Sequence, residues 1–446
     1  VFPALNWRQG KVIDARQGNN PDMDAFEVIT VAFDSDEQRQ FAADLAEHKL
    51  NEPPQIPKDD PLLNPDVISE SYRKQLVNQL EEGLESQPEF VRIAGRWFPR
   101  ALLVEVNEGH LNLAEAVLDM AGGGPLPTSD LLKEVELPEG LNPKLLEFSL
   151  DLALQEDPRF DEVGPAGKVL WFLKKLEPEG VQETPIYLQY IPTDYDRSVL
   201  TREMLDLEKK LEDELSPLPE EGTRSASVSV TLIYPHWRAG TLPLSNQLRH
   251  LFPTAYEAPR IRFVLVDGDT GRKFPGWVVR NKHYVYGLGE WYAEKKLIPG
   301  SLVRVQIGKY PGEVVISAEG RRSGREWLRT VLLGKDGGIV YGMLKHLVSA
   351  TYDERMAIVI SDVEMLDEIW NKQTQKSVPF ERVIVDTLRE IAKLNPQGHV
   401  HASELYAAVN TVRRCPPGPI MSLLASRPWF VHVGDLHFRL EDKVEV

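Results

Sequence analysis

The stretch between Gly240 and Thr330 decides the fold prediction. It reads GTLPLSNQLRHLFP over 240–253, IRFVLVDGDTGRKFPGWVVRNKHYVYGLGEWYAEKKLIPGSLVRVQIG over 261–308 and RRSGREWLRT over 321–330. Short runs rich in β-branched and aromatic residues are separated here by Gly, Asp, Asn and Pro, a pattern typical of strands joined by turns. The runs are Ile261–Val266, Trp277–Arg280, Tyr284–Tyr286 and Leu302–Ile307. With one brief helix predicted over Gly289–Lys296, the pattern favours a small closed or nearly closed β-barrel.

Charge separates this stretch from the rest of the chain. From Thr223 to Thr330 there are 17 Lys and Arg residues against 8 Asp and Glu residues, a balance of +9. The whole chain carries −17, so the remainder carries −26. A basic module inside an acidic protein is the electrostatic pattern expected of a region that contacts phosphate.

The order of three motifs resembles a known DNA-binding fold. LPLSNQLRHLFP, VLVDGDTGRKFPGWVVR and YVYGLGEWYAEKKLIPGSLVRVQI follow one another as in the DNA-binding pseudobarrel of plant transcription factors of the auxin-response and abscisic-acid-response type. Bacterial restriction endonucleases use a similar pseudobarrel to recognise DNA. Two positions depart from the family pattern, because Ser301 replaces the usual Asp after Gly300 and Glu290 replaces the Gly before Trp291. Neither departure lies in the parts of the fold that face DNA.

The resemblance implies two arms that grip the major groove of duplex DNA. Transferred by motif position, they contain Thr241, Ser245, Asn246 and Arg249 in the first arm and Arg280, Asn281, Lys282 and His283 in the second. Arginine and asparagine read guanine and adenine edges by paired hydrogen bonds, whereas lysine suits a phosphate contact that positions without specifying. The alternative interpretation is that VVRNKHY is a polar hairpin turn with ordinary solvated charges.

A second group of basic residues follows the predicted barrel. Arg321, Arg322, Arg325 and Arg329 are expected on one side of a turn and a following helix. They either extend the phosphate-binding track or pair with the acidic domains of the same chain.

A repeated pattern flanks the predicted barrel. Three segments share a helix, then Pro-x-Phe-x-x-Ile/Val, then a glycine-containing turn and an aromatic residue; the prolines are Pro88, Pro158 and Pro428. A helix ends before each proline, a strand follows, and a hairpin returns an aromatic residue to the same core. With the helices upstream, this order predicts winged helices over 36–105, 106–178 and 379–446. The copies resemble the HARE-HTH winged-helix domain shared by the RNA polymerase delta subunit, some restriction enzymes and certain chromatin proteins.

The charges of these copies differ. The balance is −6 for Asp36–Glu105, −8 for Val106–Pro178 and +1 for Pro379–Glu441. A recognition helix reading EFSLDLALQED would be repelled by DNA. We therefore expect the first two copies to bind protein or to serve structure, and the third to touch the DNA backbone at most.

The remaining segments connect these domains. Lys11–Arg16 and Ala25–Phe33 predict strands in an N-terminal β segment over 1–35, and the pattern turns helical from Asp36. Over 179–222 a leucine stripe from Leu200 to Leu215 predicts a helix docked on a neighbouring domain rather than a dimerising coil, followed by the flexible hinge EDELSPLPEEGT. Residues 331–378 form a mixed bridge with a helix predicted over 338–348, a strand over 357–360 and a helix ending near Trp370.

Composition and motifs limit the functional classes. The chain has 446 residues, of which 42% are hydrophobic and 27% charged, and it lacks an apolar run long enough for a membrane helix. A single cysteine, Cys415, excludes an internal disulfide and favours a reducing cytoplasm. Phosphate-loop, zinc-protease, nucleophile-elbow and dinucleotide motifs are absent, so we expect no enzymatic activity and no cofactor. The histidines His399, His401, His432 and His437 lie in the last domain, where ordinary strand polarity explains them as well as a metal site does, and no metal is expected.

The sequence therefore predicts an α+β multidomain protein in which three winged helices flank a small β-rich pseudobarrel. We expect a cytoplasmic, non-enzymatic protein that binds double-stranded DNA and acts in transcription, with acidic winged helices that bind protein partners. The alternatives are a factor associated with RNA polymerase, of the delta type, and the recognition component of a restriction or defence system.

Overall fold

The structure, a computed structural model, describes residues 2, 5, 8–21, 25–33, 37–46, 64–138, 140–218, 225–334, 338–375 and 378–441. Side chains are described in these ranges except at positions 321, 322 and 372–375. The chain is a mixed α+β protein with two compact units, Val1–Ser86 and Gln87–Val446. The boundary between the units falls inside the segment 36–105, which was predicted to be one winged helix.

The first unit contains a three-stranded antiparallel sheet in the order β1-β2-β3. Its strands are β1 (Gly10–Gln17), β2 (Glu27–Phe33) and β3 (Gln38–Ala43). The first two confirm the predicted strands, but the helical pattern expected from Asp36 is wrong over β3. The reason is aromatic packing, since Phe41 stacks on Phe2 at 4.4 Å and meets Phe33 edge to face at 6.4 Å.

The first unit also contains the helix α1 (Pro65–Glu85). Asn64 caps its start by accepting a hydrogen bond from the backbone N–H of Asp66, and Pro65 occupies the first turn, where its missing N–H costs nothing. None of the side chains of α1 is buried.

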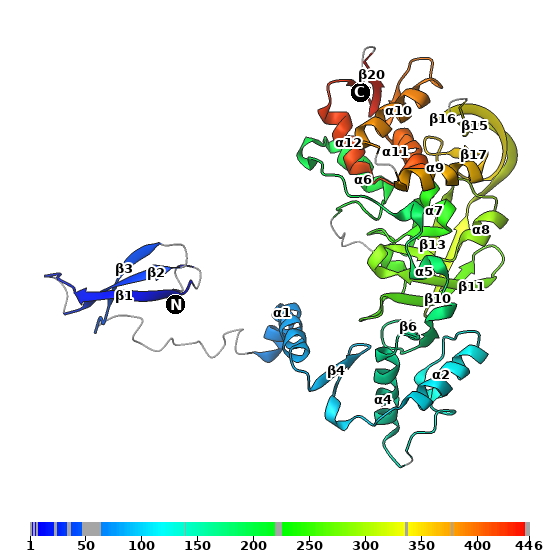
Figure 1. The fold of residues 1–446 in the computed structure, drawn as a ribbon. Coiled ribbons are helices and arrows are strands. Elements are labelled where there is room, and N and C mark those ends of the chain that lie inside the picture. The colour runs from blue at the N-terminus through cyan, green and yellow to red at the C-terminus, as the bar shows by residue number, and fades with distance from the viewer. Residues whose placement is uncertain are drawn as a thin grey trace. The chain divides into compact units, whose positions relative to one another are not determined.

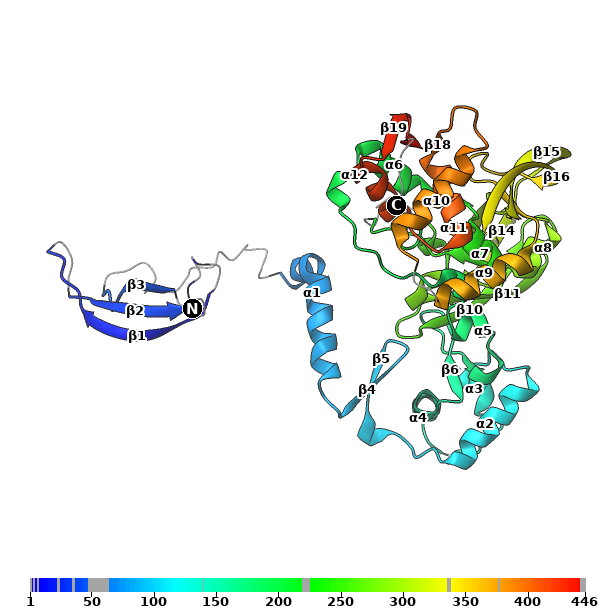
Figure 2. The same cartoon turned by 45° about the horizontal axis from the view of Figure 1, so that its top comes forward.

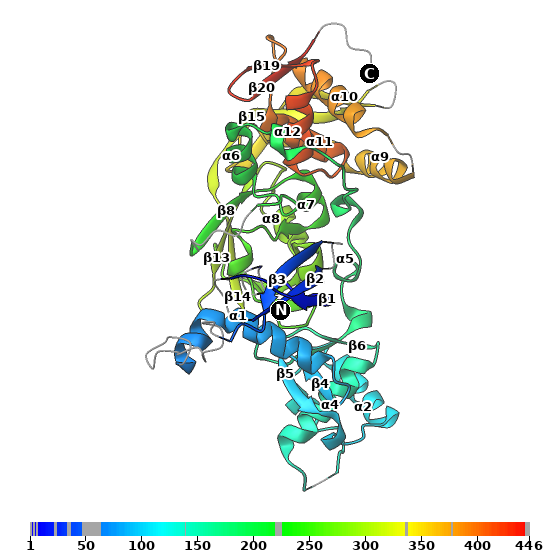
Figure 3. The same cartoon turned by 90° about the vertical axis from the view of Figure 1, so that its left-hand side faces the viewer.

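The second unit is centred on a seven-stranded sheet that curls into a half-barrel (Figure 1). Across the sheet the strands are β8 (Ser227–Thr231), β13 (Leu302–Ile307), β14 (Glu313–Ala318), β10 (Arg260–Asp267), β11 (Lys273–Val279), β12 (Tyr284–Tyr286) and β9 (Thr241–Pro243). Only β10 and β14 pair in parallel; Figure 3 shows β8 beside β13 at one edge. The sheet has two edges, β8 and β9, so the predicted closed or nearly closed barrel is an open one.

Alternating residues build the core of this half-barrel. Along β10 every second side chain is buried, and Ile261 and Leu265 have no exposed surface. Two short helices, α7 (Tyr234–Ala239) and α8 (Gly289–Glu294), follow β8 and β12, and Trp291 of α8 is fully buried in the same cluster. The predicted order of strands and of one brief helix is therefore confirmed, with α7 as an addition.

A long antiparallel ribbon follows the half-barrel. It consists of β15 (Gly320–Leu333) and β16 (Ile339–Ala350), with the short β17 (Ile358–Ile360) parallel to β15. The predicted helices after the arginine cluster and over 338–348 are therefore wrong, whereas the strand near 357–360 is confirmed. The burial period is two rather than 3.6, since Leu328 and Thr330 are buried and Trp327 before them is exposed.

Residues 87–178 form hairpins and helices beside the half-barrel. The hairpin β4 (Phe90–Ile93)–β5 (Arg96–Pro99) precedes α2 (Glu108–Met120), α3 (Thr128–Leu131), α4 (Pro143–Glu156), β6 (Phe160–Glu162) and β7 (Trp171–Leu173). The strand β7 also bridges to Leu126, and its Trp171 is fully buried against Leu118 and Leu150. Over 106–178 the observed order is thus three helices followed by a hairpin.

The same order recurs at the end of the chain. The elements are α9 (Val363–Gln375), α10 (Phe380–Ala392), β18 (Val400–His401), α11 (Ala402–Val412), α12 (Pro417–Ser426), β19 (Phe430–Gly434) and β20 (His437–Leu440), with the sheet order β18-β20-β19. Figure 2 shows α10, α11 and α12 grouped together, and one hydrophobic cluster joins them to α9 and to α7.

The connector between the two regions is folded onto them. Helix α6 (Arg202–Leu211) buries Met204 and Leu211 in that last cluster, which confirms the prediction of a docked leucine stripe. The predicted flexible hinge is wrong over 212–218, because Glu212 and Asp213 are buried; residues 219–222 lie outside the described part of the chain. Within the described residues, no helix combines the length and the apolar character needed to cross a membrane.

Candidate nucleic-acid interface

The two predicted arms line one groove of the half-barrel. The groove has a volume of about 930 Å³ and is lined by residues of both arms and of the loop between them: Leu244, Arg249, His250, Phe252, Pro253, Thr254, Tyr256, Glu257, Val278, Arg280, Asn281 and His283. We call 240–249 the first arm and 280–283 the second arm. A backbone hydrogen bond of 2.7 Å from Leu244 N to His283 O joins them directly.

The second arm is an exposed turn between two buried strands. Arg280–Lys282 forms one turn of 3₁₀ helix, and His283 closes it with a φ of +56°. The side chains of Asn281, Lys282 and His283 are exposed, while Val279 before the turn and Tyr284 after it are buried. The buried strands fix the turn at its base, so its polar side chains are presented to solvent from a rigid support.

Arg280 differs from its neighbours in the turn. Its Nη1 donates a hydrogen bond of 2.8 Å to the carbonyl oxygen of Ala258, and the side chain is half-buried. This bond holds the 256–259 loop against the turn. Arg280 therefore positions the groove wall, and the exposed members of the second arm are left to meet a ligand.

The groove is basic because its single carboxylate, among the lining residues, is already paired. Glu257 accepts hydrogen bonds from the backbone N–H of Gly95, at 3.1 and 2.9 Å, and lies 2.6 Å from Arg92 Nε. Both partners belong to the β4–β5 hairpin. Gly95 has a φ of +75°, and a Cβ there would lie 2.7 Å from the Tyr256 ring, so the hairpin tip requires glycine for this contact.

Most of the first arm is turned inward. Thr241 has no exposed surface, its hydroxyl lies 2.8 Å from His236 Nδ1, and its carbonyl accepts a hydrogen bond from the Tyr292 hydroxyl. Ser245 is 2% exposed. A buried side chain cannot touch a duplex, so the predicted DNA contacts of Thr241 and Ser245 are wrong in this structure.

The other two residues of the first arm are partly exposed. The amide of Asn246 donates a 2.6 Å hydrogen bond to the carbonyl of Leu218, which fixes that side chain to the connector. Arg249 is half-buried and lines the groove with His250. Of the four residues predicted in this arm, Arg249 is the one that the groove brings next to the second arm.

A buried ion network holds the first arm from behind. Arg414, which has no exposed side-chain surface, donates 2.8 Å hydrogen bonds to both oxygens of Asp213 and to Glu214. Glu214 also lies 3.1 Å from His236, whose other ring nitrogen meets Thr241. The network therefore connects the last domain, the connector and the first arm.

Electrostatics in this network shift the pKa values of Glu214 and Arg414 toward their charged forms. Burial opposes ionisation of Glu214, but the nearby charges of Arg414 and His236 outweigh it and hold the pKa of Glu214 below its ordinary value. The hydroxyl of Tyr406 adds a 2.6 Å hydrogen bond to Asp213. Sequence reasoning missed these residues, because the run Glu212-Asp213-Glu214 has the composition of a solvated linker; its one signal was its position at the end of a docked leucine stripe.

A second buried carboxylate pair lies where the region 106–178 meets the half-barrel. Arg260 Nη1 is 2.5 Å from Asp161 and 3.2 Å from Glu177, whose side chain has no exposed surface. Burial and then the adjacent Asp161 carboxyl raise the pKa of Glu177 to about 8. The aromatic residues Phe172 and Trp277 pack edge to face at 5.2 Å beside this pair.

The predicted arginine cluster lies on β15, away from the groove lining. Arg325 is exposed, and Arg329 pairs with Glu404 at 3.1 Å. The side chains of Arg321 and Arg322 lie outside the described residues. The pairing of Arg329 is a contact within the chain, but it is made with the last domain and not with either of the acidic copies.

The last domain brings its histidines near one another without a ligand set. The rings of His401 and His437 are 5.0 Å apart, and those of His399 and His437 are 5.9 Å apart. His401 Nδ1 meets Ser403 and its Nε2 meets Arg355 at 3.0 Å. No group of three or more metal-binding side chains occurs in the described part of the chain.

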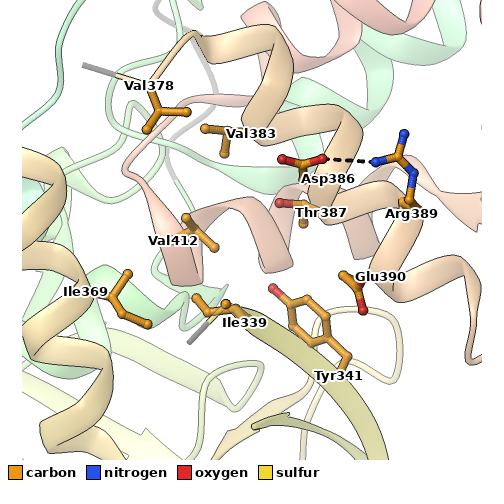
Figure 4. Close-up of a pocket in the computed structure, with 11 residues that line it drawn as sticks. Ile339, Tyr341, Ile369, Val378, Val383, Asp386, Thr387, Arg389, Glu390 and Val412 are labelled. Atoms are coloured by element: carbon orange, nitrogen blue, oxygen red, sulfur yellow. Dashed lines mark hydrogen bonds and ion pairs between the residues drawn. The ribbon is translucent and has the colours of Figure 1, made fainter. Parts of the chain in front are cut away.

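A further cavity, of about 470 Å³, lies between β16, α9 and α10 (Figure 4). Ile339, Ile369 and Val383 supply its apolar wall. Its polar rim is occupied internally, since Asp386 pairs with Arg389 at 3.1 Å and the Tyr341 hydroxyl donates to the carbonyl of Ala408. The groove between the arms is therefore the better candidate for a ligand site.

Comparison of the chain with protein-family models, with curated proteins and with solved structures finds no match.

Proposed function

We propose that this protein is a non-enzymatic DNA-binding protein that contacts duplex DNA through the groove between the two arms. The observation that carries the proposal is the convergence of both arms on one basic groove, although they are 30 or more residues apart in the sequence. Arg249, Asn281 and His283 line this groove, and Lys282 projects from the same exposed turn.

The chemistry of the turn fits base and phosphate contacts. Asparagine can pair with an adenine edge through two hydrogen bonds, and a lysine neutralises a phosphate. The turn is supported by two buried strands, so its backbone would lose little conformational freedom on entering a DNA groove. The order of the strands and the brief helix α8 after β12, which match the pattern predicted for this region, support the proposal.

We further propose that 106–178 and 379–441 are winged helices that do not read DNA in the usual way. In the first of these the third helix, α4, is covered, because its Phe148 packs on Phe98 of the β4–β5 hairpin at 4.9 Å. Asp151 of the same helix is buried and accepts a hydrogen bond from Trp171 Nε1 at 2.9 Å. A helix that is covered by a hairpin and carries a net negative charge is better suited to structure or protein contact than to a DNA groove.

The proposal is tested with an Asn281→Ala, Lys282→Ala double variant of the full chain. A duplex is first selected from a random pool with the wild-type protein, and binding is then measured by fluorescence anisotropy between 50 and 200 mM salt. We expect the double variant to bind about tenfold more weakly and to lower the slope of log affinity against log salt by about 1.

Lys309→Ala is the matched control, because Lys309 is exposed on a turn of the same half-barrel and does not line the groove. Lys309→Ala should leave both the affinity for the duplex and the salt slope close to the wild-type values. Equal affinities of the double variant and the wild type, with equal melting temperatures, would contradict the proposal, and so would failure of the wild type to select any duplex.

A further inference from the structure

The β15–β16 ribbon presents an exposed apolar and basic face that the proposed DNA contact does not use. Facing residues in the antiparallel register share a side of the sheet, and Arg325 pairs with Leu347, Trp327 with Lys345, and Arg329 with Met343. On this side Trp327 is 59% exposed and Leu347 70% exposed. Large side chains this open, placed side by side, typically mark an interaction surface.

The face is open only at one end of the ribbon. Val331 and Tyr341, on the same side, are buried in the cluster of the last domain. The last domain covers the ribbon at Val331 and Tyr341 but not at Trp327 and Lys345. A pocket of about 310 Å³, lined in part by Arg329 and Met343, lies between the covered and the uncovered parts. Leu394 and Pro396, which follow the end of α10, line this pocket together with Trp327. The exposed face therefore continues into a cavity large enough for a side chain.

The outer edge of β16 is also free of strand partners in the described residues. The sheet order is β16-β15-β17, which places the 12-residue β16 at an edge. Such an edge presents backbone N–H and C=O groups that can pair with an added strand. Figures 1 and 2 show the ribbon at the periphery of the second unit.

Charge indicates what kind of strand would be added. Among the described Lys and Arg side chains between Gly320 and Ala350, Arg325 and Lys345 are exposed on this face, whereas Arg329 is already paired with Glu404. Lys345 Nζ lies 5.2 Å from the centre of the Trp327 ring, and the exposed Arg325 follows on the same face. A partner with acidic side chains would be attracted to this face, and apolar side chains would cover Trp327 and Leu347.

We propose that the open end of β16 binds an extended acidic peptide segment of a partner protein as an added strand. Acidic side chains of the segment lie next to Arg325 and Lys345, and an apolar side chain enters the pocket beside Trp327. The peptide backbone pairs with the edge of β16 over Met343–Leu347, where the last domain no longer covers the ribbon.

Two other occupants fit the surface less well. A nucleic acid could stack a base on Trp327, but its backbone cannot pair with a strand edge. It would also leave the apolar side chains of Leu347 and Met343 largely without contacts. In a second copy of the chain, symmetric antiparallel pairing centred on Met343–Leu347 would place Lys345 opposite Lys345. Like charges directly opposite one another destabilise a sheet.

The test begins with selection of displayed ten-residue peptides on the full-length protein. We expect the selected sequences to alternate acidic and apolar residues. A synthetic fluorescein-labelled version of the most enriched peptide then serves as the probe in anisotropy titrations. The same peptide with alternate amides N-methylated, which cannot pair with a strand edge, should bind at least tenfold more weakly.

Variants of the ribbon locate the site. The double variant Arg325→Glu, Lys345→Glu should bind the acidic peptide at least tenfold more weakly than the wild type does. It should instead bind a version of that peptide in which Lys replaces Glu. Trp327→Ala should weaken both peptides. Arg382→Glu, an exposed charge reversal on α10, is the control and should leave the affinity unchanged. Melting curves of all variants confirm that they fold.

Several results would overturn the proposal. Selection of peptides without acidic residues would do so, as would equal binding of the N-methylated peptide. Displacement of the probe by a 15-nucleotide single-stranded DNA with equal strength would assign the face to nucleic acid. A dimer in light scattering that is lost in Trp327→Ala would assign it to a second copy.

Discussion

The two arms of the half-barrel carry similar polar residues but lie in opposite environments. In the first arm Thr241 and Ser245 are buried, and hydrogen bonds from within the chain occupy Thr241 and Asn246. In the second arm Asn281, Lys282 and His283 are exposed on a turn. The first arm is thus built into the protein, while the second is presented to a ligand.

The difference shows why residue type alone does not assign a binding role. The first arm is flanked by packing elements on both sides, the connector and α8, and every polar group there must find a partner inside the protein. In the second arm the side chains of Asn281, Lys282 and His283 remain exposed to solvent. The contrast between the arms can be tested by changing each arm and the network behind it.

The largest effect is expected from Asp213→Ala. This change leaves the Arg414 guanidinium buried without its main partner, and removing one member of a buried ion pair costs about 3–5 kcal/mol of unfolding free energy. Denaturant unfolding measures the loss. Asp206→Ala on the exposed face of α6 is the matched control and should cost less than about 0.5 kcal/mol. Equal stability of both variants would show that the network does not hold the first arm.

The next effect separates the two arms. Thr241→Val removes a buried hydroxyl and leaves His236 Nδ1 without its partner, so we expect a loss of about 1–3 kcal/mol of unfolding free energy. Asn281→Ala should change stability by less than about 0.5 kcal/mol but should weaken duplex binding. The opposite pattern, with binding lost in the folded Thr241→Val and retained in Asn281→Ala, would reverse the assignment of the arms.

Arg280 should behave as a positioning residue. Arg280→Ala removes the hydrogen bond to the Ala258 carbonyl and should lower the unfolding free energy by about 1 kcal/mol as well as weaken binding. Arg280→Lys keeps a donor and a charge and should restore part of both losses. Binding that falls in Arg280→Ala with no change in stability would instead make Arg280 a direct contact.

The smallest effect concerns pH. The pKa of Glu177 in the folded protein is about 8, above the ordinary value of 4.5, so its protonated form stabilises the fold. That contribution is complete below pH 4.5 and is lost as pH rises through 8. The melting temperature should therefore fall between about pH 4.5 and 8, and Glu177→Gln, which mimics the neutral form, should reduce this fall by roughly 2 °C. A steeper fall in the variant would contradict the raised pKa.

Much of the strand pattern could be predicted from the sequence, and the failures have physical reasons. Runs such as Ile261–Val266 are rich in β-branched and aromatic residues and are bounded by turn residues, and the structure has a strand there whose side chains are alternately buried. Residues 339–350 carry Val, Tyr, Leu and Met at spacings that suit either a helix or a strand. These residues form a strand because they pair with β15, and the local sequence contains no pattern that predicts this pairing.

The candidate site was predicted only in part. The charge of residues 223–330 and the residue types of the turn at Arg280–His283 are enough to indicate a basic surface and one exposed arm. The role of Arg280 in holding the Ala258 carbonyl, and the pairing of Glu257 with Arg92, depend on contacts between segments far apart in the chain. Sequence patterns carry no information on such pairings.

The sequence by itself determined the strands of the half-barrel, the docked leucine stripe and the basic character of the central region, because these follow from local periodicity and composition. Only the tertiary structure decided which polar residues face solvent. The run 212–214 has the composition of an exposed linker, yet it is buried because Arg414, some 200 positions later, pairs with Asp213. Thr241 is a polar residue of the predicted arm, yet its hydroxyl contacts His236 of the same network. A buried charge is tolerated only when an oppositely charged group lies beside it, and the tertiary fold brings that group into place.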